Sequence, residues 1–137
     1  MEDLVSTTPR HRHAAWRITY HIVWIPKYRR KVLRGRIAET LREAIEEKAR
    51  ELNAEIIALA IMPDHIHLIV SAPPRISPSE LVKHLKGYTA RRLGEEYPWL
   101  RKRGHIWARG YWVSTLGDIS IDRALDYVRS QLGRRKL

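Results

Sequence analysis

The stretch EIIALAIMPDHIHLIVS, residues 55–71, decides the fold because it contains two strand patterns joined by a very short turn. Residues 55–62 form a nearly continuous apolar run of strand length, and residues 65–71 form a second one. Pro63 and Asp64 interrupt the two runs and favour a turn between them. The stretch therefore predicts a β-hairpin in the middle of the chain.

Further elements are predicted on both sides of this hairpin. Alternation of apolar and polar residues predicts strands, and apolar residues spaced three and four apart predict helices. Ser77 and Glu80 form a capping box around Pro78, which marks the start of a helix. The expected order is a strand at 16–24, a helix at 37–52, the two hairpin strands, a helix from 78 to about 93, a strand at 111–116 and a helix from 118 to about 132.

This order of elements predicts an α+β fold. The first six elements give the ferredoxin-like βαββαβ arrangement, also found in RNA-recognition modules, in which two helices cover one face of a four-stranded antiparallel sheet. The seventh element, a C-terminal helix, lies outside that core and can pack on the open sheet face or on a neighbouring subunit. We expect one domain over residues 1–137, with a core at about 15–132 and a basic N-terminal arm at 1–14.

The composition indicates a polyanionic partner. The chain has 26 Lys and Arg against 15 Asp and Glu, a net charge of +11, which is high for a metabolic enzyme and favours nucleic acid. The absence of cysteine excludes disulfides, thiolate zinc sites and cysteine catalysis. No apolar run reaches the ~18 residues of a membrane span, and the N-terminus lacks a signal pattern, so we expect a cytoplasmic protein.

The positive charge is unevenly distributed along the chain. Residues 10–36 contain nine Lys and Arg and no carboxylate, which is typical of a surface that faces phosphates. Each basic cluster taken alone can also be a solvated face that confers solubility. The candidate DNA-contacting residues are Arg10, Arg12, Arg17, Lys27, Arg29, Arg30, Lys31, Lys86, Arg91 and Arg109.

Two histidines stand out on the second hairpin strand. Because side chains alternate along a strand, His65 and His67 share the face opposite the core, where two imidazoles can hold one metal ion. Short histidine pairs also occur on solvated strands without any metal. Asp64 offers an orienting carboxylate or a further ligand. A site of this kind, with oxygen ligands and an open position, suits Mn²⁺ or Mg²⁺ acting on phosphate, and zinc is the alternative.

The last helix carries a tyrosine away from its apolar stripe. Tyr127 lies roughly 130° and Gln131 roughly 90° from the centre of that stripe, and the two are one turn apart. A tyrosine so placed is either a surface aromatic or a nucleophile. The apolar stripe is formed by Ile121, Leu125, Val128 and Leu132.

Four motifs in this order resemble those of the insertion-sequence 200/605 transposases, the small single-tyrosine HUH enzymes that move DNA as single strands. They are YHIVWIPKYR at 20–29, MPDHIHL at 62–68, WARGYWV at 107–113 and Tyr127 followed four residues later by Gln131. The resemblance covers about residues 15–132. It implies that Tyr127 is the nucleophile and that His65, His67 and Gln131 hold the divalent cation.

The resemblance also implies a homodimer that recognises hairpins near the ends of a mobile element. It further implies swapped sites, in which the histidines of one chain meet Tyr127 of the other. Such chemistry forms a 5′-phosphotyrosine and needs no nucleotide cofactor, which agrees with the lack of a phosphate-binding glycine loop.

Two other interpretations compete with this one. A non-enzymatic module that binds RNA or single-stranded DNA has the same order of elements, but its aromatic signature belongs on the third strand, where this chain has the histidines. The second is an HUH nickase or a domesticated, repeat-associated relative of the transposases.

Overall fold

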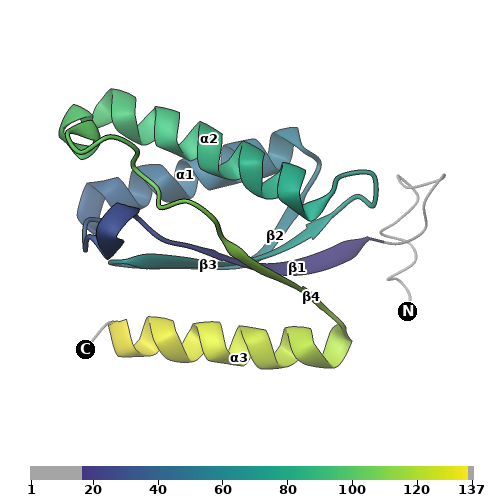
Figure 1. Cartoon of the computed structure of the whole chain (residues 1–137). Helices are drawn as coiled ribbons and strands as arrows, with labels where there is room; N and C mark the ends of the chain where they lie inside the picture. Colours follow the sequence, from purple (N-terminus) through teal and green to yellow (C-terminus); the bar gives the residue numbers. More distant parts are fainter. Residues whose placement is uncertain (1–16, 136–137) are drawn as a thin grey trace.

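The sheet is antiparallel and four-stranded, with the strand order β2-β3-β1-β4, in the computed structural model, which describes residues 17–135 (Figure 1). This is the strand order expected of a ferredoxin-like βαββαβ core. Residues 1–16, including the predicted arm and Trp16, lie outside the described part. The strands are β1 (Ile18–Trp24), β2 (Glu55–Met62), β3 (His65–Ala72) and β4 (Trp112–Leu116).

Three helices enclose the sheet from both sides. Helices α1 (Gly35–Glu51) and α2 (Pro78–Glu96) cover one face, as predicted, and α3 (Asp118–Arg135) crosses the other (Figure 1). None of the helices within 17–135 is both long and apolar enough to cross a bilayer. The main core lies between the sheet and the first two helices, and its buried members include Ile22, Trp24, Leu41, Ile45, Ile66, Leu68, Val70, Leu81, Leu85 and Leu93.

Two short 3₁₀ helices occupy segments for which the sequence predicts no element. They are η3 (Lys27–Arg29), after β1, and η4 (Pro98–Arg101), after α2. Helix α2 also continues three residues past the predicted end at Leu93, because Arg92 pairs with Glu96 one turn ahead at 3.1 Å. Pro98 then starts the next turn.

The segment between α2 and β4 is tied to α2 by polar contacts, of which those of Trp107 and Thr89 are buried. The Trp107 indole donates to Thr89 Oγ1 at 3.0 Å, and Thr89 itself donates to the Leu85 carbonyl at 2.7 Å. The Lys86 ammonium donates to the carbonyls of Ala108 and Gly110 at 2.9 and 2.8 Å. These contacts hold the loop and thereby fix where β4 enters the sheet.

Helix α3 packs on the sheet of its own chain. Val128 is buried, with 4% of its surface exposed, in a small cluster with Ala60, Met62 and Ile69. Ala124, one turn earlier, packs against the same cluster. The predicted apolar stripe is therefore confirmed at Val128, while the side chain of Leu132 lies outside the described residues. Of the two dispositions open to the seventh element, this chain shows the open sheet face.

Candidate active site

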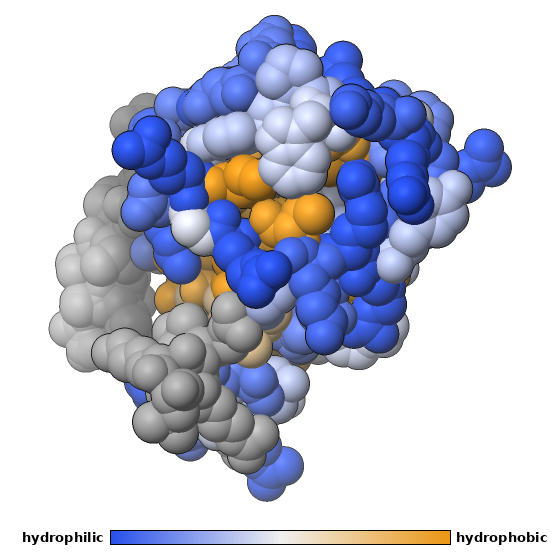
Figure 2. All heavy atoms as spheres, turned by 90° about the vertical axis from the view of Figure 1, so that its left-hand side faces the viewer, coloured by the Kyte–Doolittle hydropathy of each residue, from blue (hydrophilic) through white to orange (hydrophobic). Residues whose placement is uncertain are grey.

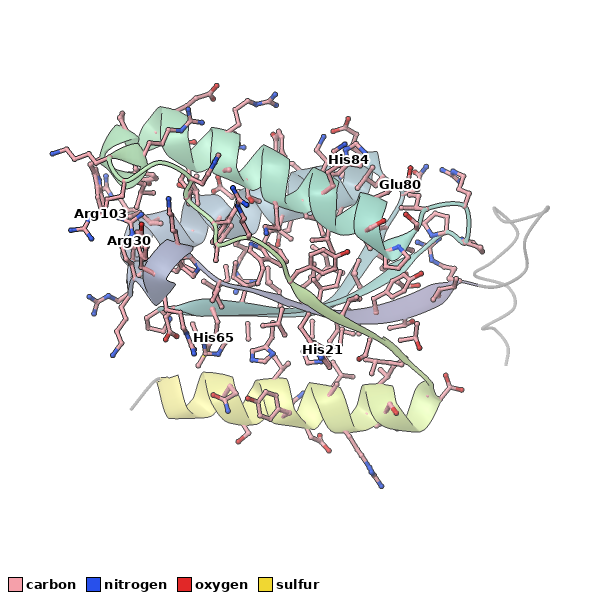
Figure 3. All side chains as sticks on the ribbon, in the orientation of Figure 1. His21, Arg30, His65, Glu80, His84 and Arg103 are labelled. Carbon is pink, nitrogen blue, oxygen red and sulfur yellow. The ribbon has the colours of Figure 1, made fainter. Side chains whose placement is uncertain are left out.

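The histidine pair lies on the sheet face that α3 covers. Ile66 and Leu68 of β3 point into the main core, so His65 and His67 point the other way, as the alternation predicts. Their ring centroids are 5.0 Å apart. Figure 3 shows His65 and His21 in the layer between the sheet and α3.

Asp64, in the hairpin turn, orients His65. Its Oδ1 lies 2.8 Å from Nδ1 of His65, and its Oδ2 lies 3.3 Å from the guanidinium of Arg29. The hydrogen bond from His65 is the main cause that lowers the pKa of Asp64, and Arg29 adds to it. A carboxylate that holds Nδ1 in this way turns the opposite ring nitrogen, Nε2, outward and makes it a better ligand.

His21, on β1, orients His67. Its Nε2 lies 3.0 Å from Nδ1 of His67, and the edge of the Trp112 indole packs against the His21 ring with centroids 5.0 Å apart. Burial, with smaller contributions from the neighbouring His21 and His65, lowers the pKa of His67 to about 4. His67 is therefore neutral at pH 7, the state in which an imidazole can bind a metal.

His21 is a site residue for which the sequence analysis predicts no role, although the sequence contains a signal for it. His21 alternates with the core residues of its strand, so it faces the same side as the histidine pair. The predicted fold also places β1 next to β3. The two facts together bring His21 to the histidine pair.

Tyr127 reaches the histidines from α3. Its ring centroid lies 5.3 Å from that of His67, and 46% of its surface is exposed. The neighbouring Val128 holds this turn of the helix against the sheet. Gln131, one turn further on, is half-buried, and the C-terminal half of α3 runs beneath His65 (Figure 3).

The arrangement fits a divalent cation. The Nδ1 atoms of His65 and His67 are both engaged, which leaves two Nε2 atoms as donors. Among residues 17–135, no three His, Asp or Glu side chains are grouped closely enough to hold a metal ion. A cation held by the pair would need an oxygen donor of another kind, and the candidate is the amide of Gln131, half-buried on α3 one turn after Tyr127.

The structure divides the predicted basic residues into separate groups. Figure 3 shows Arg30 at the end of the molecule where His65 also lies. Lys27, Arg29 and Lys31 are its neighbours in and after η3, and Arg29 contacts Asp64 of the hairpin turn. Arg17 lies at the other end of β1, about 20 Å away, where it donates to Ser71 and to the Asn53 carbonyl. Arg10 and Arg12 lie outside the described residues.

The remaining three candidates lie on or beside α2. Lys86 is held by loop carbonyls, and it lines a cavity of about 280 Å³ together with Arg109. Arg91 lies over the ring of Tyr88, 5.3 Å from its centroid. No contact found here tests whether these residues bind DNA, and that stays a prediction.

The group at the hairpin end is larger than predicted. Residues 27–36 and 98–105 lie together there, and we call their surface the basic end. Lys27 Nζ donates to the Arg103 carbonyl and Arg30 to the Leu100 carbonyl, both at 3.0 Å. The basic end has no carboxylate, and its cations are Lys27, Arg29, Arg30, Lys31, Arg34, Arg36, Arg101, Lys102 and Arg103.

Known proteins resemble this chain in sequence and in fold. The ISDra2 transposase TnpA of Deinococcus radiodurans is 34% identical over 123 residues, which are 88% of each chain. The transposase for insertion sequence element IS200 of Salmonella typhimurium is 31% identical over 128 residues, 91% of this chain and 84% of that protein.

Two solved structures superpose on the chain. One, assigned as a transposase of Deinococcus radiodurans R1, has a TM-score of 0.71 and 32% identity, and covers 85% of this chain and 92% of its own. The other is a REP-associated tyrosine transposase bound to a REP hairpin, with a TM-score of 0.68 and 21% identity over 86% of this chain and 68% of its own. The second shows a shared fold.

A family model described as "Transposase IS200 like" matches residues 14–131, which include the whole sheet, the histidine pair and Tyr127. This match decides against the RNA-recognition module. It agrees with the family that the four motifs indicate. The chain belongs to the IS200-like transposases.

Proposed function

We propose that this transposase cuts and rejoins single-stranded DNA through Tyr127, beside a divalent cation held by His65, His67 and Gln131. The observation that carries the proposal is the approach of the Tyr127 ring to His67, at 5.3 Å. His67 is itself held in place, because its Nδ1 lies 3.0 Å from His21. The contact therefore brings a tyrosine to an oriented imidazole, which favours a nucleophile over a surface aromatic.

The proposed reaction is a transfer of the DNA phosphate to the tyrosine. The Tyr127 hydroxyl gives its proton to solvent and its oxygen attacks the scissile phosphorus. The bond from phosphorus to the 3′ oxygen breaks, and that oxygen takes a proton from solvent and leaves as a 3′-hydroxyl. The product is a 5′-phosphotyrosine, which keeps the energy of the phosphodiester. A 3′-hydroxyl of another strand then attacks this linkage and releases the tyrosine, so no nucleotide cofactor is needed.

The cation, Mg²⁺ or Mn²⁺, would polarise the scissile phosphate and balance its charge in the transition state. Two features of the chain would favour binding of this cation. Asp64 and His21 fix the two imidazoles through their Nδ1 atoms. Gln131 sits on the same helix as Tyr127, so the nucleophile and the amide ligand move as one unit.

The proposed substrate is single-stranded DNA with hairpins near the ends of the element. The basic end supports it, because nine cations without a carboxylate favour a polyanion beside the histidines. The structural neighbour that binds a REP hairpin supports it further. Two ends must be cut while each chain offers one such tyrosine, so we propose a homodimer as the working unit.

The test is a search for the covalent adduct. Labelled single-stranded DNA is incubated with the protein and Mn²⁺, and denaturing electrophoresis then resolves a protein–DNA conjugate. We expect Tyr127→Phe to bind DNA but to form no adduct and no cleaved strand, since only the hydroxyl is lost. Tyr111→Phe removes a hydroxyl from another exposed tyrosine and should leave the adduct unchanged.

Cleavage by Tyr127→Phe would contradict the proposal. In that case water would be the attacking group, and the protein would be a hydrolytic nuclease.

A further inference from the structure

The turn after β1 has an unusual backbone. Tyr28 and Arg29, in η3, have φ angles of 63° and 51°. Residues other than glycine, asparagine and aspartate rarely adopt these left-handed backbone angles, because their Cβ atom crowds the backbone. Backbone strain of this kind is concentrated at functional sites, so two consecutive strained residues suggest a function for the side chains of Tyr28 and Arg29.

The strained turn displays Tyr28 to solvent. Its side chain is 66% exposed, the most of any exposed large hydrophobic residue described. The Lys27 ammonium stands 5.3 Å from the centroid of its ring. An aromatic ring with an adjacent cation is the combination that binds unpaired bases and their phosphates.

The turn is also held rigidly. The backbone N–H of Lys27 donates to the Ile106 carbonyl, and that of Ala108 donates to the Ile25 carbonyl, both at 2.9 Å. With the two side-chain bonds to the Leu100 and Arg103 carbonyls, these contacts fasten η3 to the second segment of the basic end. Because the backbone that carries Tyr28 is held in place, binding of a base to the ring needs little further ordering of the turn.

The turn is linked to the proposed active site. Arg29 reaches Asp64 at 3.3 Å, and Asp64 holds His65 at 2.8 Å. Figure 2 shows the end face, on which strongly hydrophilic side chains surround a hydrophobic centre. This face therefore offers both cations and apolar surface, and Arg29 connects it through Asp64 to His65.

We propose that Tyr28 is a stacking site for an unpaired base of single-stranded DNA, with the cations of the basic end binding the flanking phosphates. The inference rests on the proposed function and adds where the strand is held. Single-stranded DNA is favoured over duplex, because a duplex hides the faces of its bases. A second copy of the chain is disfavoured as the partner of this surface, because the nine cations of one basic end would face the nine cations of the other and repel them.

The test measures binding of a labelled oligothymidylate of about 20 nucleotides by fluorescence anisotropy, without divalent metal. We expect Tyr28→Ala to raise Kd at least about fivefold, the lower end for loss of one base–aromatic stack. Tyr28→Trp should bind at least as tightly as the parent chain. Tyr111→Ala, at a tyrosine that is 43% exposed outside the basic end, is the matched control and should not change Kd.

A second variant separates a binding role from a structural one. Glycine adopts the left-handed region freely, so Tyr28→Gly should melt at or above the Tm of the parent chain and yet bind oligothymidylate as weakly as Tyr28→Ala. A lower Tm for Tyr28→Gly would overturn the inference and show that the ring supports the fold.

The remaining outcomes are also decisive. The stacking site would be overturned if Tyr28→Ala had an unchanged Kd for oligothymidylate. It would also be overturned if Tyr28→Ala lost as much affinity for a random duplex, or if the substitution changed only the oligomeric state, measured by light scattering. If the chain forms the Tyr127 adduct while Tyr28→Ala binds normally, this inference alone fails. If the parent chain binds no single-stranded DNA, the proposed function fails with it.

Discussion

At the scale of single residues, His67 shows how neighbours prepare an imidazole for a metal. Burial keeps it neutral, and His21 takes one ring nitrogen so that the other is presented outward. Removal of a residue that hydrogen-bonds a metal-binding histidine commonly weakens metal affinity by about 10-fold to 100-fold. His21 is thus a positioning residue in the proposed site.

We therefore expect His21→Ala to weaken Mn²⁺ binding by roughly tenfold or more, measured by isothermal titration calorimetry without DNA. His21→Gln, whose amide can still bond Nδ1, should recover part of the affinity. The control is Thr19→Ala, two residues earlier on the same face of β1. Equal Mn²⁺ affinity of His21→Ala and the parent chain would remove His21 from the site.

At the scale of elements, the capping box of α2 is formed as the sequence predicts. Ser77 Oγ accepts from the Glu80 backbone N–H, and Glu80 Oε1 accepts from the Ser77 backbone N–H, both at 3.1 Å. The bond from the Ser77 backbone N–H to the carboxylate, and then the one from the Ser77 hydroxyl, lower the pKa of Glu80 below its usual value of 4.5. The carboxylate therefore stabilises the fold above pH 4.5, and this contribution is lost as the pH falls through the lowered pKa.

Ser77→Ala should lower the free energy of unfolding by about 1 kcal/mol at pH 7, measured by urea titration. Glu80→Gln keeps the geometry of the box without its charge, so its stability should fall less than that of the parent chain between about pH 5 and pH 3. Parallel losses for both proteins over this range would mean that the Glu80 charge contributes nothing.

At the scale of the whole molecule, one chain already brings its tyrosine to its histidines. Helix α3 docks through Val128 and Ala124 on its own sheet, and Tyr127 meets His67 of the same chain. The family resemblance implies the swapped arrangement instead. Val128 is the buried member of this contact on α3, and burial of a valine side chain gives roughly 1.5–3 kcal/mol.

Mixing Tyr127→Phe chains with His67→Ala chains distinguishes the two arrangements. If each site forms within one chain, both sites of the heterodimer keep one defect, and we expect no adduct with labelled single-stranded DNA. The two chains carry different tags so that exchange into heterodimers is verified by sequential purification. Restored adduct formation would show that α3 docks on the partner and that the sites are composite.

Local sequence patterns were enough to predict the hairpin, the N-terminal cap of α2 and the face of the histidines. These features depend on local patterns: alternation over residues 65–70, the Ser77 box, and apolar spacing in α1 and α2. Their physical causes act within a few residues, so they can be read without knowing the fold. The pair of His65 and His67 and the nucleophile candidate Tyr127 were visible for the same reason.

The tertiary structure alone decided which distant residues meet. The bond between His21 and His67 joins residues 46 positions apart, and it follows from the β1–β3 register, in which Val23 faces His67. Tertiary contacts also join residues 27–36 to residues 98–105, since Lys27 donates to the Arg103 carbonyl and Arg30 to the Leu100 carbonyl. Register and docking are set by burial of side chains from several elements at once, and no local pattern contains that information.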